Sequence, residues 1–293
     1  MWGRRLSGDQ KDGVRQSVQS QRPGSFNESR GERIEVFLSK RLAYRYFWDL
    51  VTHLVAREFR LRYRQALLGW LWAIGTPLTR LAILTYVFTR VLPLGIDDYP
   101  VFVFTGLIVW QWFAAGVASA SSSAVDRRDL LFRPGLPRVA VPIVSVLTDG
   151  LDYLAALPIL FLFLLLGNGV PATAAALPVL LAVQALLTLG LGFLACAANV
   201  YVRDVCLFVN VATLIGWYLT PVFYRAQDVP ESFHFVLDLN PMAHLLSAHR
   251  AILIDGRLPE ARSFFILVAV CTVIFLVGFA VYRRMSPNFV DEL

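Results

Sequence analysis

Charged residues are scarce in this 293-residue sequence, at 16%, whereas a soluble domain carries about 25%. Lysine is almost missing, since only Lys11 and Lys40 are lysines among the 27 basic residues. Lys11 is followed by Asp12 and Lys40 by Arg41, so the Gly-Lys-Ser/Thr core of a P-loop is not present. The sequence therefore excludes ATP hydrolysis by the P-loop mechanism.

Other motifs of catalysis and metal binding are also missing. The sequence contains no GxSxG, HExxH or CxxC pattern. Its three cysteines, Cys196, Cys206 and Cys271, lie in or beside apolar runs, where small buried residues are the ordinary interpretation. His244 and His249 are five residues apart and do not share a helical face. We expect no catalytic residue, no metal site and no cofactor, and nothing indicates binding of nucleic acid.

The amino terminus also lacks the apolar core of a signal peptide. Residues 1–40 are polar and rich in Gly, Ser, Gln and Arg, and we predict a disordered cytoplasmic tail. The carboxyl-terminal residues 286–293 are predicted to be a second, short cytoplasmic tail. The intervening residues 41–285 form the predicted transmembrane domain.

Long apolar runs dominate that domain, in keeping with 57% hydrophobic residues and a mean hydropathy of +0.58. A helix needs about 20 apolar residues to cross a bilayer, and lipid requires every backbone polar group to bond internally. The predicted fold class is an all-α polytopic membrane protein with six transmembrane helices. The expected spans are about 67–92, 101–120, 141–166, 174–200, 205–224 and 263–282. Gly190 and Gly192 in the fourth should permit close helix approach.

The basic residues indicate the orientation of these spans. Excluding the intramembrane Arg80, 21 of them precede residue 66 or fall in the 121–140 loop, the 201–204 turn and the carboxyl end, against 5 on the alternate side. Cytoplasmic loops carry the excess of Lys and Arg. We therefore predict that both termini are cytoplasmic.

Two further segments are too short or too polar to span. Residues 45–65 form an amphipathic pattern with Phe47, Val51 and Val55 on one face, typical of an interfacial helix next to membrane lipids. Strict alternation over 59–64 has a period of two, but an isolated strand would lack a partner, so we still predict a helix. Residues 225–262 hold short apolar pieces around Asn240-Pro241, which favour a re-entrant outer hairpin between the last two spans.

Several polar or aromatic residues lie inside the apolar runs. Arg80 should face a cavity or a partner helix, or its side chain should extend to the headgroups. Trp110 and Trp112 near mid-membrane either pack helices or line a path for sugar rings. Asp149 and Asp152 share a helical face, and their alternatives are a chemical role, a position near the headgroups, or a bond to another helix.

Four ordered stretches resemble the type-two ABC export permeases, most closely the branch that exports lipid-linked polysaccharides such as O-antigen, teichoic acid and mycobacterial galactan. They are REFRLRYRQALLGWLWAIGTPL at 57–78, FRPGLPR at 132–138, VRDV at 202–205 and NPMAH at 240–244, with Arg250 beyond the last. The resemblance covers about residues 45–285. Arg80 departs from it, because the family has an apolar residue there.

The resemblance implies a homodimeric permease of the bacterial inner membrane that works with two copies of a separate ATP-binding cassette subunit. The implied cargo is a polyprenyl-diphosphate-linked polysaccharide. The Arg-rich composition with few lysines suits a high-GC bacterium, and an actinobacterial galactan exporter is the sharper expectation. The docking residues for the ATPase would be Arg57, Arg60, Arg62, Arg64, Arg127, Arg128, Leu131 and Phe132. The outer gate would hold Asn240, Pro241, His244 and Arg250. The aromatic lining of the path would be Trp70, Trp72, Trp110, Trp112, Tyr218 and Tyr224.

Two alternatives remain. A drug or antibiotic efflux permease of the same superfamily would be favoured by few mid-span aromatics and no basic interfacial helix, whereas both features are present. A membrane enzyme acting on polyprenyl phosphate would need Asp126 or Asp149 for turnover without an ATPase.

Overall fold

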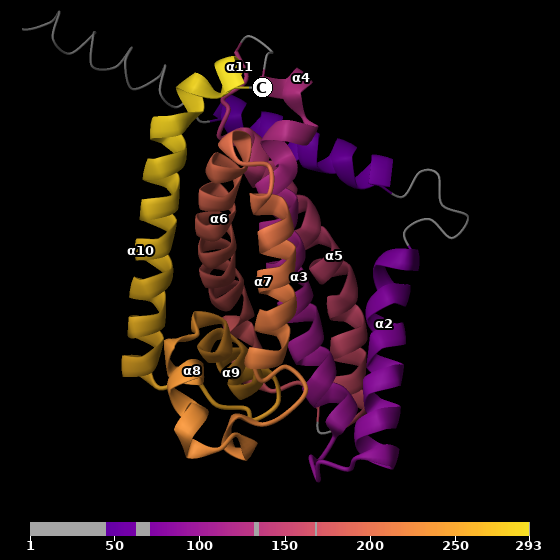
Figure 1. Ribbon diagram of the computed structural model, residues 1–293. Coiled ribbons are helices and arrows are strands. Elements are labelled where there is room, and N and C mark those ends of the chain that lie inside the picture. Colours follow the sequence, from indigo (N-terminus) through magenta and orange to yellow (C-terminus); the bar gives the residue numbers. More distant parts are fainter. Residues whose placement is uncertain (1–44, 63–70, 132–134, 168, 293) are drawn as a thin grey trace, which may run out of the picture. The chain divides into compact units, whose positions relative to one another are not determined.

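The computed structural model describes residues 45–62, 71–131, 135–167 and 169–292 (Figure 1). Every regular element in these ranges is a helix, which confirms the all-α prediction. The chain divides into two compact units, Met1–Asp49 and Leu50–Leu293. Only residues 45–49 of the first unit are described, so the predicted 1–40 tail lies outside the described residues.

Residues 45–62 are helical, which confirms the helix prediction over 59–62 despite the alternating pattern there. The long helices are α2 (Leu71–Tyr86, continued by a π-turn at Val87–Val91), α3 (Tyr99–Asp126), α5 (Ala140–Leu166), α6 (Leu177–Tyr201), α7 (Val205–Leu219) and α10 (Ala261–Met285). The short helices are α4 (Arg128–Leu131), α8 (His234–Leu239), α9 (Pro241–Leu253) and α11 (Phe289–Glu292). Single 3-10 turns lie at Ala172–Ala176, Ala226–Asp228, Glu231–Phe233 and Ser286–Asn288.

The helix α3 is the centre of the bundle, because it packs along both α5 and α6, and α2 and α7 also contact it. The helix α10 packs mainly against α6. The short α4 and α11 lie at one end of these helices, and α8 and α9 at the other (Figure 1). We call α8 and α9 the hairpin, and the two ends of the bundle the α4 end and the hairpin end.

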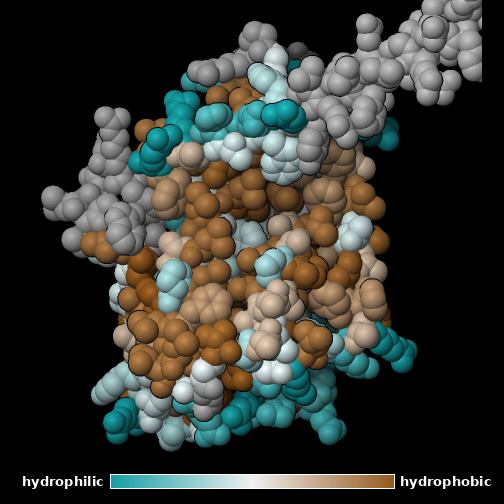
Figure 2. Space-filling view, turned by 180° about the vertical axis from the view of Figure 1, so that it is seen from behind, coloured by the Kyte–Doolittle hydropathy of each residue, from teal (hydrophilic) through white to brown (hydrophobic). Residues whose placement is uncertain are grey.

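An apolar band covers the middle of the face shown in Figure 2, with polar side chains at either end. Within the described ranges, four helices are long and apolar enough to cross a membrane: Tyr99–Asp126, Ala140–Leu166, Ala172–Tyr201 and Ala261–Asn288. The helix α7 is shorter, at 15 residues. Length and composition therefore identify a membrane protein.

Small residues bring α6 and α10 into backbone contact. A Cβ atom at Gly190 would lie 2.7 Å from the Cα atom of Phe275, and one at Gly278 would overlap the carbonyl of Gly190. On the other side of α6, a Cβ atom at Gly192 would lie 2.8 Å from that of Ala120 on α3. The expectation that these glycines permit close approach is confirmed.

The fifth apolar run is helical over a shorter range than predicted. The helix ends at Leu219, whereas the expected span ran to residue 224. Thr220 is extended, at φ −100° and ψ 137°, because the following Pro221 disfavours helical geometry in the residue before it. The segment 220–224 therefore leaves the helix axis and becomes available to contacts from the hairpin end.

Candidate functional site

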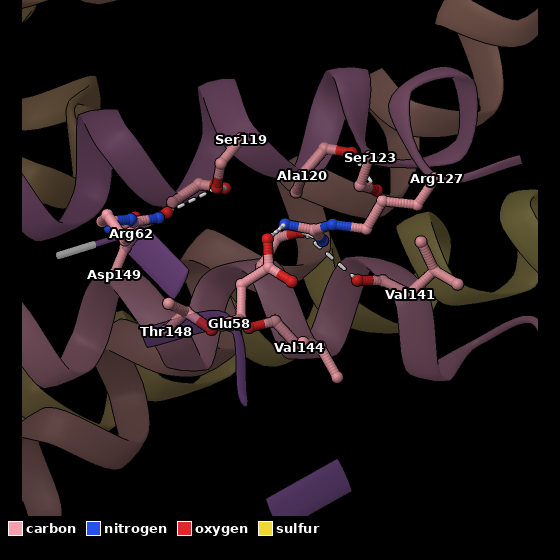
Figure 3. Close-up of polar contacts among 12 residues, drawn as sticks. Glu58, Arg62, Ser119, Ala120, Ser123, Arg127, Val141, Val144, Thr148 and Asp149 are labelled. Carbon is pink, nitrogen blue, oxygen red and sulfur yellow. Dashed lines mark hydrogen bonds and ion pairs between the residues drawn. The ribbon is translucent and has the colours of Figure 1, made fainter. Parts of the chain in front are cut away.

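Charged side chains from three elements meet near the α4 end (Figure 3). Arg62, in the helix over 45–62, places its Nη1 atom 2.8 Å from Asp149 Oδ1 and 2.8 Å from Asp152 Oδ2 on α5. The Ser119 hydroxyl on α3 donates a hydrogen bond to Asp149. Asp149 is only 4% exposed, so this ion pair lies mainly within protein.

A second ion pair of reversed polarity lies beside the first. Glu58 Oε1 is 2.8 Å from Arg127 Nη2, and Arg127 also donates to the Ser145 hydroxyl on α5. Glu58 and Arg62 are four residues apart and so share a helical face. We call Glu58, Arg62, Arg127, Asp149 and Asp152 the ion-pair network. It joins the helix over 45–62 to both α3 and α5.

The network settles what the aspartate pair contacts. Of the three alternatives for Asp149 and Asp152, the geometry shows a bond to another helix, through Arg62. The other acidic pair, Asp126 and Asp129, is exposed near the end of α3. Sequence reasoning missed the ion-pair network because its partners are far apart in the chain and share no local pattern.

The residues predicted to dock an ATPase fall into three groups. Arg57 and Arg60 are exposed, and Arg128 is half-buried at the start of α4. Arg62 and Arg127 instead bond within the ion-pair network. Leu131 is buried in a cluster with residues of α6 and α10. Arg64 and Phe132 lie outside the described residues.

At the hairpin end, the predicted gate residues start the helix α9. The Asn240 side chain caps it, accepting from the Met242 amide at 3.0 Å, and donates to the Thr220 hydroxyl at 2.8 Å. Pro241 occupies the first turn, a position that tolerates proline. His244 is exposed, with its Nε2 atom 2.9 Å from the Asp238 carbonyl. Asn240 thus ties the hairpin to the end of α7.

Arg250 on α9 binds the backbone of the segment after α7. Its guanidinium donates to the Pro221 and Val222 carbonyls, each at 2.6 Å, and lies 3.5 Å from the ring centre of Phe102 on α3. A Cβ atom at Gly106 would lie 2.9 Å from Arg250 Nη2, so the glycine leaves room for it. We call this contact set the Arg250 clamp. Burial lowers the pKa of Arg250 to about 9, and it remains charged at neutral pH.

His249 precedes the clamp and is fully buried. Its Nδ1 atom lies 2.9 Å from the Leu245 carbonyl one turn earlier. Burial lowers the pKa of His249 to about 4. The described residues contain no group of His, Cys, Asp and Glu side chains arranged to hold a metal.

Two adjoining grooves run beside α7. The first, about 640 Å³, lies between α2, α3 and α7; it is lined among others by Arg80, Trp110, Gln111, Asn210, Trp217 and Tyr218. The second, about 580 Å³, lies between α3, α6, α7 and the hairpin; it is lined among others by Phe113, Leu191, Phe208, Val209, Thr220 and Met242. We call them the polar groove and the apolar groove. Trp110 and Thr213 line both.

The grooves bring together part of the predicted aromatic lining. Trp110 and Tyr218 both line the polar groove, and Trp217, which sequence reasoning missed, lies 6.2 Å from Trp110 between ring centres. Tyr224 donates to the Tyr218 carbonyl nearby, at 3.0 Å. The aromatic residue type of Trp217, next to Tyr218 in the same apolar run, was an available signal.

Two of the other predicted aromatics, Trp112 and Trp72, are described and do not line these grooves. Trp112 is buried, donates to the Val146 carbonyl at 3.1 Å and lies 5.4 Å from Tyr153 between ring centres, contacts that suit helix packing. Trp72 is exposed on α2. Trp70 lies outside the described residues.

Comparison with known proteins identifies the family of this chain. An O-antigen export system permease protein RfbA of Klebsiella pneumoniae is 26% identical over 250 residues, covering 85% of this chain and 96% of that protein. One from Myxococcus xanthus is 30% identical over 247 residues, covering 83% and 95%. The polysialic acid transport protein KpsM of Escherichia coli is 25% identical over 239 residues, covering 80% and 92%. The model of the ABC-2 type transporter family matches residues 49–254. This chain belongs to the ABC-2 type transporter family.

Proposed function

We propose that this chain is the membrane permease of an ATP-driven exporter that moves a polyprenyl-diphosphate-linked polysaccharide out of the cytoplasm. The observation that carries the proposal is the family match over residues 49–254 together with relatives named for export of O-antigen and polysialic acid. The polar groove supports it, because aromatic rings beside amide groups suit sugar rings. Galactan is the sharper candidate for the glycan.

The experiment is deletion of the gene, followed by analysis of surface glycan and of lipid-linked glycan in the cytoplasmic leaflet. We expect surface glycan to be lost while its precursor accumulates inside, and the wild-type gene to restore export. The purified chain should co-elute with an ATP-hydrolysing subunit. Unchanged surface glycan with loss of drug resistance would favour the efflux alternative, and turnover of a polyprenyl phosphate by the isolated chain would favour the enzyme.

The topology that we propose has six spans, with both termini and the α4 end in the cytoplasm and α8–α9 as a re-entrant hairpin at the outer side. It is supported by the 21 to 5 division of basic residues. Labelling with a membrane-impermeant maleimide tests it in a Cys206→Ser background. Val170→Cys should be labelled from outside and Asp129→Cys only after permeabilisation; the reverse pattern contradicts the topology.

The working assembly that we propose is a homodimer bound to two ATP-binding cassette subunits. Membership of the family implies the cassette partner. In this assembly the polar grooves of two copies, with Trp110, Tyr218 and Trp217, line the glycan path, because one bundle offers only a groove of about 640 Å³. Weak aromatic contacts let a long chain move without being trapped.

The docking surface that we propose for the cassette subunit is the α4 end, and the exposure of its arginines supports a choice among them. Arg57 and Arg60 are exposed there, whereas Arg62 and Arg127 hold the helix over 45–62 to α3 and α5. We expect Arg57→Glu with Arg60→Glu to abolish co-purification of the ATPase while the permease still inserts. Arg262→Glu, also exposed but at the start of α10 at the opposite end of the bundle, is the matched control and should leave co-purification unchanged. Normal co-purification of the double variant would contradict the docking proposal.

A further inference from the structure

Arg80 is an intramembrane cation that the proposed function does not yet use. It lies nine residues, about 14 Å, beyond Leu71 in a helical stretch that runs to Val91. Its side chain is exposed in the polar groove, and within the described ranges it makes neither a hydrogen bond nor an ion pair. Such a charge at mid-membrane is costly unless it is paired. We therefore expect an anion to bind beside the Arg80 guanidinium.

The protein supplies no carboxylate for this role. Five of the six predicted spans contain no Asp or Glu at all. The remaining span, 141–166, contains only Asp149 and Asp152. Both of these are bound by Arg62. A second copy of the chain has the same sequence and adds no other intramembrane acid. The counter-ion of Arg80 is therefore expected to come from outside the protein.

The surroundings of Arg80 define the shape of that ligand. Gln111 and Asn210 add amide groups to the polar groove, and Gln111 Oε1 is buried without a partner in the described part of the chain. The apolar groove adjoins at Trp110 and Thr213 and follows α7 from Val205, a helix of 15 residues or about 22 Å. A polar head at Arg80 can thus continue into a long apolar chain.

We propose that the two grooves together bind the lipid carrier of the cargo: Arg80 contacts the diphosphate, and the apolar groove takes the prenyl chain. A guanidinium matches phosphate oxygens with two parallel donors. A prenyl diphosphate must cross the middle of the membrane in each export cycle. The guanidinium of Arg80 offsets the cost of bringing the diphosphate anion there. The inference rests on the proposed function and adds the binding site for its carrier.

The test measures binding of labelled farnesyl diphosphate to the permease–ATPase complex in nanodiscs of zwitterionic lipid. Farnesol and inorganic diphosphate are the comparison probes. We expect Arg80→Gln to weaken binding of farnesyl diphosphate by about tenfold or more, without changing that of farnesol. Arg90→Gln, on the same helical stretch but outside the grooves, is the matched control. Ala212→Trp, which fills the apolar groove, should weaken both prenyl probes.

Equal affinity of wild type and Arg80→Gln for farnesyl diphosphate would overturn the proposal. Inorganic diphosphate binding as tightly as farnesyl diphosphate would overturn the role of the apolar groove. Arg80→Lys keeps the charge but lacks two parallel donors, so it should weaken binding of farnesyl diphosphate, though less than Arg80→Gln does; wild-type affinity in this variant would contradict a phosphate held by two donors. Because binding is measured without export, failure here is distinguishable from failure of the deletion experiment.

Discussion

Arg62 and Arg250 are both held by oxygen atoms, at opposite ends of the same bundle, but the oxygens differ in kind. Arg62 bonds to the side chains of Asp149 and Asp152 and retains 34% of its side-chain exposure. Arg250 bonds to the backbone carbonyls of Pro221 and Val222 and is 9% exposed. A side-chain ion pair can separate and re-form by changes of side-chain rotamer, and Arg62 keeps contact with water although Asp149 is only 4% exposed. The carbonyls of Pro221 and Val222 belong to the backbone after α7 and cannot rotate away as a side chain can. Leaving them buried without a donor would be costly.

The difference has a functional meaning under the proposed mechanism. The α4 end must transmit movement from a partner to α3 and α5, and its links are side-chain ion pairs across three elements. The hairpin end must keep the segment after α7 beside α3 and α9 for the outer gate to have a defined position. We therefore expect mutations of the Arg250 clamp to act on stability, and mutations of the ion-pair network to act on coupling.

The largest expected effect is at Arg250. Arg250→Ala leaves the Pro221 and Val222 carbonyls without their donor, at about 1–3 kcal/mol each. We expect a lower thermal midpoint of the purified permease in detergent, followed by tryptophan fluorescence, and loss of export. Gly106→Ala should show the same defect in weaker form, because its Cβ atom would lie 2.7 Å from the Val222 carbonyl oxygen. A midpoint equal to wild type in both variants would remove the distinction between the two ends.

A smaller effect at the same end follows from His249. Its pKa is about 4 in the folded protein and about 6.5 when unfolded. Between these values the unfolded chain binds more protons, so the free energy of unfolding falls as the pH drops, by about 2 kcal/mol at pH 5. Thermal midpoints at pH 7 and pH 5 measure this loss. His249→Gln should remove that part of the pH dependence, and an identical pH response in the variant would show that another group is responsible.

The sequence was informative where one segment decides its own structure. Apolar length predicted the long helices, and Gly190 predicted a close helix approach, whose partner the structure shows to be α10. The helix over 45–62 followed from its pattern of Val51 and Val55, both of which are buried. These features depend on residues within a few turns of each other, and so a single sequence contains them.

The sequence was uninformative where distant segments meet. Glu58 and Arg127 are 69 residues apart, and nothing local selects one acid for one arginine. Arg250 was expected at the outer gate, but its carbonyl partners exist only because α7 ends before Pro221. Trp217 meets Trp110 in the polar groove because α7 packs on α3. The periodicity of a single segment does not predict which helices pack together.

The smallest expected effect on stability is at the pair of Glu58 and Arg127, and it gives the sharpest test of the comparison. The two side chains are 33% and 18% exposed, so the pair is expected to contribute about 1 kcal/mol. Glu58→Arg and Arg127→Glu should each leave the thermal midpoint nearly unchanged but reduce export and cargo-stimulated ATP hydrolysis. The double variant with both changes restores opposite charges and should recover coupling, which a double-mutant cycle quantifies. Recovery in the double variant would show that coupling depends on the opposite charges of the pair, not on the sign of either residue alone. If both single variants export normally, the network only packs the helix over 45–62, and the contrast with the Arg250 clamp does not extend to function.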